Sequence, residues 1–210
     1  MRAGKLQKWS GIAAAGVALV LLSSCGGADS PTAPPDCSEF PDQQTSPYVL
    51  PWSVGASYQA FLHLLRGNSV QRFAIDFTMP IGTTVVAARA GTVVRVEERY
   101  VDGDHTAGHE NRIFLEHSDG TVARYVHLTR DGALVEVGEL VAQGDPIALS
   151  GNTGNSSGPH THFDVTSCCC ITPPNYNELP CGQTLPLSFR NTQPHACGLE
   201  HGALYTAEPF

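Results

Sequence analysis

The sequence has few charged residues and no cluster of basic ones. Of its 210 residues, 15% are charged, against about 25% in an average soluble protein. Acidic residues outnumber basic ones by 20 to 12, which gives a formal charge of −8 at pH 7. Binding to nucleic acid depends on clustered Lys and Arg side chains, so the composition excludes a nucleic-acid partner. Disorder is excluded as well, because 41% of the residues are hydrophobic and they recur along the chain.

Lysine is nearly absent, since Lys5 and Lys8 are the only two. Their positions exclude one class of protein. Residues 135–145 are similar to the hairpin of lipoyl and biotinyl carrier domains, which need an exposed lysine at the hairpin tip. No lysine follows Lys8, so the chain is not a carrier of this kind.

The sequence also lacks an apolar run long enough to cross a membrane. Residues 11–22 are apolar, but a spanning helix needs roughly 20 such residues. Basic residues precede this run, and we therefore interpret residues 1–24 as a signal peptide. Leu22-Ser23-Ser24-Cys25 is similar to a bacterial lipoprotein cleavage box, which implies that Cys25 becomes the lipidated first residue. An ordinary signal peptide is the alternative.

Lipid on Cys25 would hold the chain at a membrane without a spanning helix, because each buried CH₂ contributes about 0.8 kcal/mol. Gly26 and Gly27 follow Cys25 with no Asp at the next position, as in lipoproteins sorted to the outer membrane. We therefore expect a lipid-anchored protein of the cell envelope, at the outer membrane and facing the periplasm. Residues 25–58 are rich in Gly, Pro and Ser, which predicts an extended tether.

Seven cysteines are present, and six remain once Cys25 is set aside for lipid. In an oxidising compartment an even number predicts up to three disulfides. Fifteen pairings of six cysteines exist, and the sequence does not choose among them. A metal site in the run 168–170 is disfavoured, because adjacent side chains on an extended strand alternate faces. The six are Cys37, Cys168, Cys169, Cys170, Cys181 and Cys197.

From residue 59 onward the chain consists of short β-branched or aromatic runs separated by turn formers, with no sustained helical period. This predicts an all-β fold, a compact antiparallel sandwich or barrel over residues 59–166. Residues 167–210 then form a Cys-rich C-terminal extension. The predicted strands are 70–77, 84–88, 91–98, 112–117, 121–128, 134–137, 146–150, 161–166 and, in the extension, 184–190.

Histidines and one aspartate mark the candidate site. His160 and His162 follow a Gly/Asn/Ser loop and begin an apolar strand, on which residues i and i+2 face the same side. His127 lies at the end of a second strand, and Asp76 ends an otherwise apolar one. Taken singly, each of these residues has an ordinary structural interpretation.

Seven motifs that include these residues occur in one order over residues 70–166. Together they are similar to the lysostaphin/LytM-type zinc peptidases, which act on peptidoglycan peptides. The motifs are Phe73–Phe77, Pro80–Thr83, Ala87–Val94, His117–Gly120, Tyr125–Leu128, Val137-Gly138 with Val141–Gly144, and Ser150–Gly154 through Gly158–Phe163.

This resemblance implies a lipid-anchored zinc endopeptidase that hydrolyses peptide bonds of bacterial peptidoglycan. Asp76 and His162 match the family's metal ligands. His160 matches the histidine that takes the proton of the water, and His127 the one that stabilises the transition state. Zn²⁺ with three protein ligands keeps a fourth position for water and lowers its pKa toward about 7.

The first metal histidine of the family is missing from its usual position, four residues before Asp76, where Arg72 stands. A guanidinium has no lone pair to offer a metal. His63 is the nearest substitute, but a hairpin of 58–65 with 70–77 would place it opposite Phe73, on the wrong face without a bulge or register shift.

His105 and His109 lie in a polar loop over residues 102–111 and are weaker candidates for the third ligand, which stays open. His195 and His201 are expected at the surface. Arg72 also supports an alternative, a zinc-free module of the same fold that binds cell wall or regulates a wall-hydrolase partner. The peptide bond that would be cleaved is not predicted.

Overall fold

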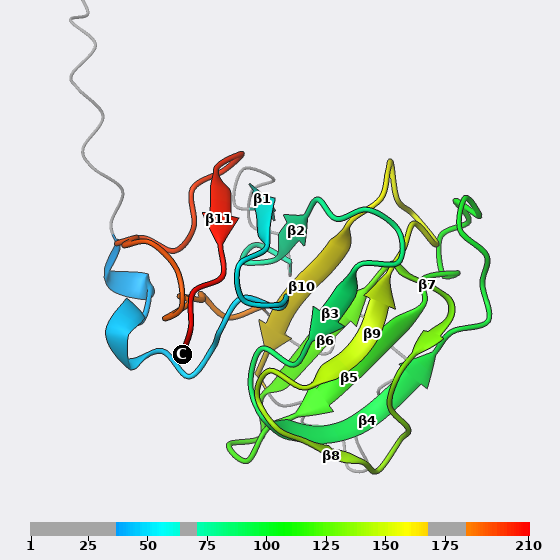
Figure 1. Cartoon of the computed structure of the whole chain (residues 1–210), viewed down its shortest axis with the longest axis horizontal. Helices are drawn as coiled ribbons and strands as arrows, with labels where there is room; N and C mark the ends of the chain where they lie inside the picture. The colour runs from blue at the N-terminus through cyan, green and yellow to red at the C-terminus, as the bar shows by residue number, and fades with distance from the viewer. Residues whose placement is uncertain (1–36, 64–70, 168–183) are drawn as a thin grey trace, which may run out of the picture. The chain divides into compact units, whose positions relative to one another are not determined.

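The strands form two antiparallel sheets. The computed structural model describes residues 37–63, 71–167 and 184–210. The large sheet has the order β11-β1-β2-β10-β6-β5-β4-β8 and the small one β3-β9-β7 (Figure 1). The all-β prediction is confirmed. The bounds are β1 Ser57–Leu62, β2 Ile75–Phe77, β3 Thr84–Val86, β4 Gly91–Glu97, β5 Arg112–Glu116, β6 Val122–Val126, β7 Leu128–Ala133, β8 Leu140–Val141, β9 Pro146–Ser150, β10 Thr161–Thr166 and β11 Leu204–Thr206, with short 3-10 helices η1 Cys37–Glu39 and η2 Gln43–Thr45.

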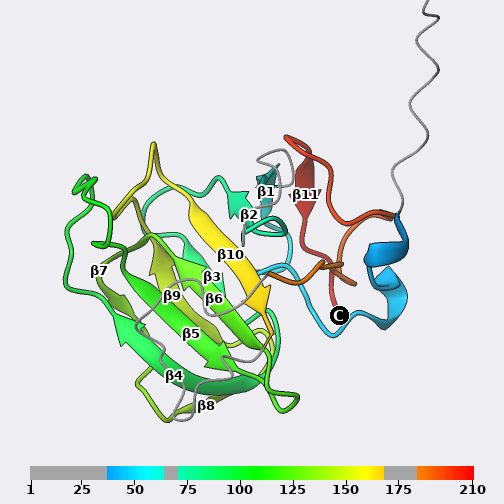
Figure 2. The same cartoon turned by 180° about the vertical axis from the view of Figure 1, so that it is seen from behind.

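The small sheet covers one face of the large sheet, and the core lies between them (Figures 1 and 2). Side chains alternate along each strand of the large sheet. Ile75 and Phe77 of β2 lie in the core, as do Phe163 and Val165 of β10. The intervening residues therefore face the other side of the sheet, which is the side that carries the polar site.

Two predicted strands are absent. Residues 134–137 enter a turn in which Glu139 N donates to Glu136 O and Gly138 has a φ of 93°. Residues 184–190 make only an isolated bridge, from Thr184 to Thr166. Pro186 cannot donate to a ladder, which prevents the bridge from growing into a strand.

Residues 37–58 belong to the folded domain, which corrects the prediction of a tether that ends at residue 58. Tyr48, Leu50 and Trp52 lie in the core. Leu50 N donates to Asn191 Oδ1 at 2.7 Å, a contact with the C-terminal extension. The many prolines in this segment fit a chain that packs without regular structure as well as they fit a tether. Residues 25–36, the signal peptide and Cys25 lie outside the described residues.

The C-terminal extension is built into the large sheet. β11 pairs with β1, and Phe189 lies in the core. A disulfide joins Cys37 to Cys197 and so ties the two ends of the described chain together. The other four cysteines expected in disulfides lie outside the described residues. Among the helices of the described part, none is long and apolar enough to cross a membrane.

Candidate metal centre

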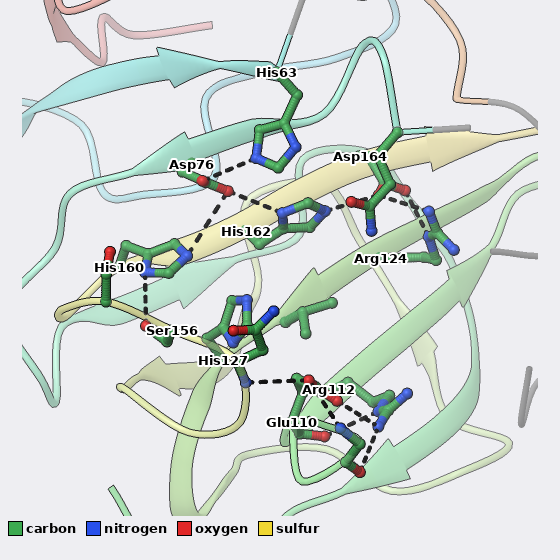
Figure 3. Close-up of a pocket in the computed structure, with 15 residues that line it drawn as sticks. His63, Asp76, Glu110, Arg112, Arg124, His127, Ser156, His160, His162 and Asp164 are labelled. Atoms are coloured by element: carbon green, nitrogen blue, oxygen red, sulfur yellow. Dashed lines mark hydrogen bonds and ion pairs between the residues drawn. The ribbon is translucent and has the colours of Figure 1, made fainter. Parts of the chain in front are cut away.

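Three side chains converge on the polar face of the large sheet. His63 directly follows β1, Asp76 lies in β2 and His162 in β10. Asp76 Oδ2 is 2.9 Å from His63 Nε2, and Asp76 Oδ1 is 2.9 Å from His162 Nδ1. One candidate ligand atom of each residue lies within 4.8 Å of the other two (Figure 3). Two imidazoles and one carboxylate form a donor set found in catalytic zinc sites, so the residues present fit a divalent metal ion.

The register between β1 and β2 places His63 in this group. Leu62 pairs with Ile75, and His63 N donates to Ala74 O at 3.0 Å. His63 therefore lies opposite Ala74, which shares a strand face with Asp76. The predicted position opposite Phe73 was wrong by one residue, and one residue of register moves a side chain to the other face of a sheet.

Arg72 and the loop histidines lie apart from the centre. The Arg72 guanidinium is 3.0 Å from the Glu39 carboxylate, and both side chains are well exposed. His109 Nδ1 is 2.7 Å from Asp104 Oδ2, and its ring stacks on Tyr100. His105 is exposed. The third donor is therefore His63.

A buried ion pair fixes the orientation of His162. Asp164 Oδ2 lies 3.0 Å from His162 Nε2, and Arg124 donates two hydrogen bonds to the Asp164 carboxylate, at 2.6 and 2.7 Å. Both side chains of the pair are 1% exposed. Because Nε2 faces Asp164, Nδ1 is the nitrogen of His162 that is directed toward Asp76. A carboxylate behind a metal-ligating histidine fixes its ring and tautomer in this way.

Hydrogen bonds and neighbouring charges shift the pKa values of the centre in the direction opposite to the effect of burial. Burial opposes ionisation of Asp76, but hydrogen bonds from His162 and His63 hold its pKa well below the ordinary value. Burial also disfavours a charged His162, but Asp164 and Asp76 raise its pKa to about 9. Burial disfavours the charged form of Asp164 too, and Arg124 nevertheless holds its pKa below the ordinary value. These carboxylates therefore favour positive charge between them, which a proton or a metal ion can supply.

His127 and His160 stand beside the three donors, with ring centroids 4.6 Å apart. His127 Nδ1 is 2.6 Å from Thr153 O, and His160 Nδ1 is 2.8 Å from Gly158 O. A carbonyl only accepts, so each Nδ1 carries a proton, and in the neutral tautomer each Nε2 keeps a lone pair. His160 Nε2 lies 3.7 Å from Asp76 Oδ1, close to the donors.

Two backbone features place these histidines. His127 has a φ of 66°, a conformation rare for a residue other than glycine, and the chain turns there from β6 into β7. Gly151 bridges to His160, and a Cβ on Gly151 would lie 2.3 Å from Thr129 N. Only glycine allows the loop to approach β7 so closely. Burial, with His160 and His162 nearby, lowers the pKa of His127 to about 4, so this residue is neutral near pH 7.

A groove crosses the metal centre. It consists of two cavities of about 490 Å³ each, which share His63, Asp76, Ser157 and His160. A peptide that passed from one cavity to the other would therefore cross two of the three donors, His63 and Asp76. The cavity that we call the polar half is also lined by Gln71, Gly108, Glu110, Arg112, Arg124, Val126, His127, Asn155, Ser156, His162 and Asp164 (Figure 3). The cavity that we call the apolar half is also lined by Phe61, Leu62, Thr78, Gly158, Pro159 and His201.

The structure brings together all four site residues that the resemblance indicated, and it adds residues that sequence reasoning missed. Asp164 follows His162 by two residues, so strand alternation alone placed it on the same face. Arg124 gave no such signal, because the pairing of β6 with β10 sets its partner. His201 is exposed, as expected, but it lines the groove.

An all-β domain with a His–Asp–His group in a groove, and two further histidines beside it, has the arrangement of a hydrolytic metal centre. Comparison with known proteins defines the family. Residues 71–172 match the model of peptidase family M23, and the chain therefore carries a domain of this family.

The relatives of this chain include a peptidoglycan DD-endopeptidase and lysostaphin. Peptidoglycan DD-endopeptidase ShyA of Vibrio cholerae is 32% identical over 123 residues, which are 58% of this chain and 26% of ShyA. Lysostaphin of Staphylococcus simulans is 37% identical over 97 residues, 46% of this chain and 18% of lysostaphin. The chain thus spans less than a third of the length of these relatives.

Solved structures of peptidases are also similar to this chain. The catalytic domain of Staphylococcus simulans lysostaphin is 29% identical with a TM-score of 0.40, over 60% of this chain and 82% of that one. A zinc-containing peptidase from Vibrio cholerae is 32% identical with a TM-score of 0.40, over 57% of this chain and 36% of that one.

Proposed function

We propose that this protein is a zinc-dependent endopeptidase that hydrolyses peptide bonds of bacterial peptidoglycan. The observation that carries the proposal is the third donor. His63 completes with Asp76 and His162 a set of two imidazoles and one carboxylate, which suits zinc. The family and the names of the relatives support a peptidoglycan substrate.

Zinc bound by these donors would supply a Lewis acid that activates water and polarises a carbonyl. The chain's own groups do the rest. Asp76 is 20% exposed on its side chain and opens the donor set to the groove. His160 Nε2 lies beside Asp76, and in the neutral imidazole it is placed to accept a proton from an attacking water. Once protonated, the same nitrogen can return the proton to the departing amine.

His127 is neutral near pH 7 and presents its Nε2 lone pair next to His160, whose ring centroid lies 4.6 Å away. A neutral imidazole there hydrogen-bonds water or a peptide N–H and orients it. Stabilisation of a developing oxyanion, the role indicated by the resemblance, requires a donor, whereas neutral His127 with its proton on Nδ1 offers only an acceptor at Nε2.

We also propose that lipid on Cys25 anchors the domain in the cell envelope, at the outer membrane and facing the periplasm. The support is the sequence Leu22-Ser23-Ser24-Cys25. The alternative of a zinc-free binding or regulatory module rested on Arg72, and His63 removes that reason. No observation in the described residues favours a wall-hydrolase partner.

Digestion of purified peptidoglycan tests the proposed function. The full chain, loaded with one equivalent of zinc, should release soluble muropeptides with new amino groups. His162→Ala should abolish release, because it removes a metal donor. His105→Ala is the matched control, since His105 is exposed and outside the groove, and it should keep full activity. Absence of release by the zinc-loaded wild type would overturn the proposal.

A further inference from the structure

The two halves of the groove differ in charge. Glu110, Arg112, Arg124 and Asp164 line the polar half. In the apolar half, by contrast, Asp76 of the metal centre is the only acidic or basic residue apart from histidines in the described lining. Phe61, Leu62 and Pro159 are its hydrophobic residues. A charged side chain placed there would lose its hydration without gaining a partner, whereas an apolar side chain would be favoured.

The outer wall of the apolar half is formed by Phe61 and His201. Their rings meet edge to face, with centroids 5.4 Å apart and an interplanar angle of 90°. Such an arrangement is the favoured geometry for two aromatic rings. Phe61 is 38% exposed and lines the cavity, so its ring is accessible to a ligand.

His201 is held in place by backbone contacts between the C-terminal extension and β1. Leu62 N donates to His201 Nδ1 at 3.0 Å, and Gly202 N donates to Ala60 O at 2.7 Å. Ala60 N in turn donates to Ala203 O at 3.0 Å. The wall is therefore part of the sheet and not a loose tail, and it lies outside residues 71–172, which match the peptidase family.

We propose that the apolar half is a subsite for a small apolar side chain next to the scissile bond, and that Phe61 and His201 determine its selectivity. The inference rests on the proposed function and specifies its substrate. Alanine is the apolar residue of peptidoglycan stem peptides, and its methyl group would contact the wall. Glycine has no side chain and would leave the subsite unfilled. The enzyme thus selects a cross-link with alanine at the cleaved bond over a glycine bridge.

Synthetic cross-linked peptides test this selectivity. One peptide carries alanine on both sides of the scissile bond, and two others carry glycine in place of one alanine. For the zinc-loaded full chain, one of the two replacements should lower kcat/KM by about tenfold or more, the usual effect of one missing methyl group in an apolar pocket. In Phe61→Ala and His201→Ala, the ratio of kcat/KM for the alanine peptide to kcat/KM for that glycine peptide should fall close to one.

Two measurements keep the result interpretable. Zinc content and melting temperature of both variants should match the wild type, and His105→Ala should keep the wild-type preference. Equal rates on all three peptides, or an unchanged ratio in both variants, would overturn the subsite while the endopeptidase activity stands. Cleavage of none of the peptides, with none bound in calorimetry, would overturn both proposals. Binding that prefers alanine without cleavage would support the subsite and contradict the proposed function.

Discussion

His63 shows why the metal centre could be predicted only in part. The His-x-His spacing and the family resemblance indicated Asp76, His162, His160 and His127, and the structure places all four in one groove. The third donor depended on which residue of β2 lies opposite His63, and periodicity does not fix that register. A shift of a single residue separates a ligand from a side chain on the opposite face.

The buried pair of Arg124 and Asp164 carries a second prediction at this scale. Arg124→Met should lower the free energy of unfolding by about 3–5 kcal/mol, because it leaves a buried carboxylate without its main counter-charge. Arg130→Met is the control. Arg130 pairs with Asp131 at 3.4 Å, but their side chains are 56% and 78% exposed, and such a surface pair contributes less than about 1 kcal/mol.

Urea denaturation of the metal-free proteins measures both losses. Equal stability of the two variants would contradict a structural role for the buried pair. Because Arg124 lines the groove, zinc affinity should be measured alongside. It should fall in Arg124→Met, since Asp164 would no longer be fixed behind His162, and it should stay unchanged in Arg130→Met.

At the scale of elements, strands with clear turn signals on both sides were predictable. The strands expected at 146–150 and 161–166 have those bounds as β9 and β10, since Gly144 and Gly151 flank β9 and Gly158-Pro159 precedes β10. β7 and β11 were missed for different reasons. Asp131 and Gly132 read as a turn, but lie within β7. β11 is three residues long and depends on β1, far away in the sequence, for its pairing.

The disulfide joins two elements that the sequence did not connect. Cys37 begins η1, and Cys197 lies shortly before β11, with a sequence separation of 160 residues. Closing so long a loop restricts the unfolded chain, so Cys37→Ser with Cys197→Ser should lower the free energy of unfolding by about 2–5 kcal/mol. Urea denaturation without reductant measures the loss. An unchanged unfolding midpoint would mean that this disulfide contributes nothing to stability.

For the whole molecule, the domain begins well before residue 59, the start that composition suggested. Trp52 is 1% exposed, and its Nε1 donates to Ala56 O at 2.9 Å. Trp52→Ala should therefore cost about 3–5 kcal/mol, the usual effect of removing a large aromatic side chain from a core. Val54→Ala, at a side chain that is 51% exposed, is the control and should change little.

Thermal unfolding of the two variants gives the comparison. A melting temperature that Trp52→Ala leaves unchanged would restore the tether interpretation of this segment. Composition misled here because prolines and glycines are equally common in extended tethers and in irregular segments that pack against a core. Within residues 48–52, all residues except Pro51 have apolar side chains suited to a core. This short run was the sequence signal that distinguished a packed segment from a tether.

The central claim is that His63, Asp76 and His162 together hold one zinc ion. Elemental analysis of the purified chain, after exchange against micromolar free zinc, tests it directly. Wild type and Arg72→Ala should each contain close to one zinc per chain, and His63→Ala should lose most of it, because two remaining donors bind zinc weakly. A wild-type chain without zinc, or a His63→Ala chain that keeps a full equivalent, would contradict this account of the centre.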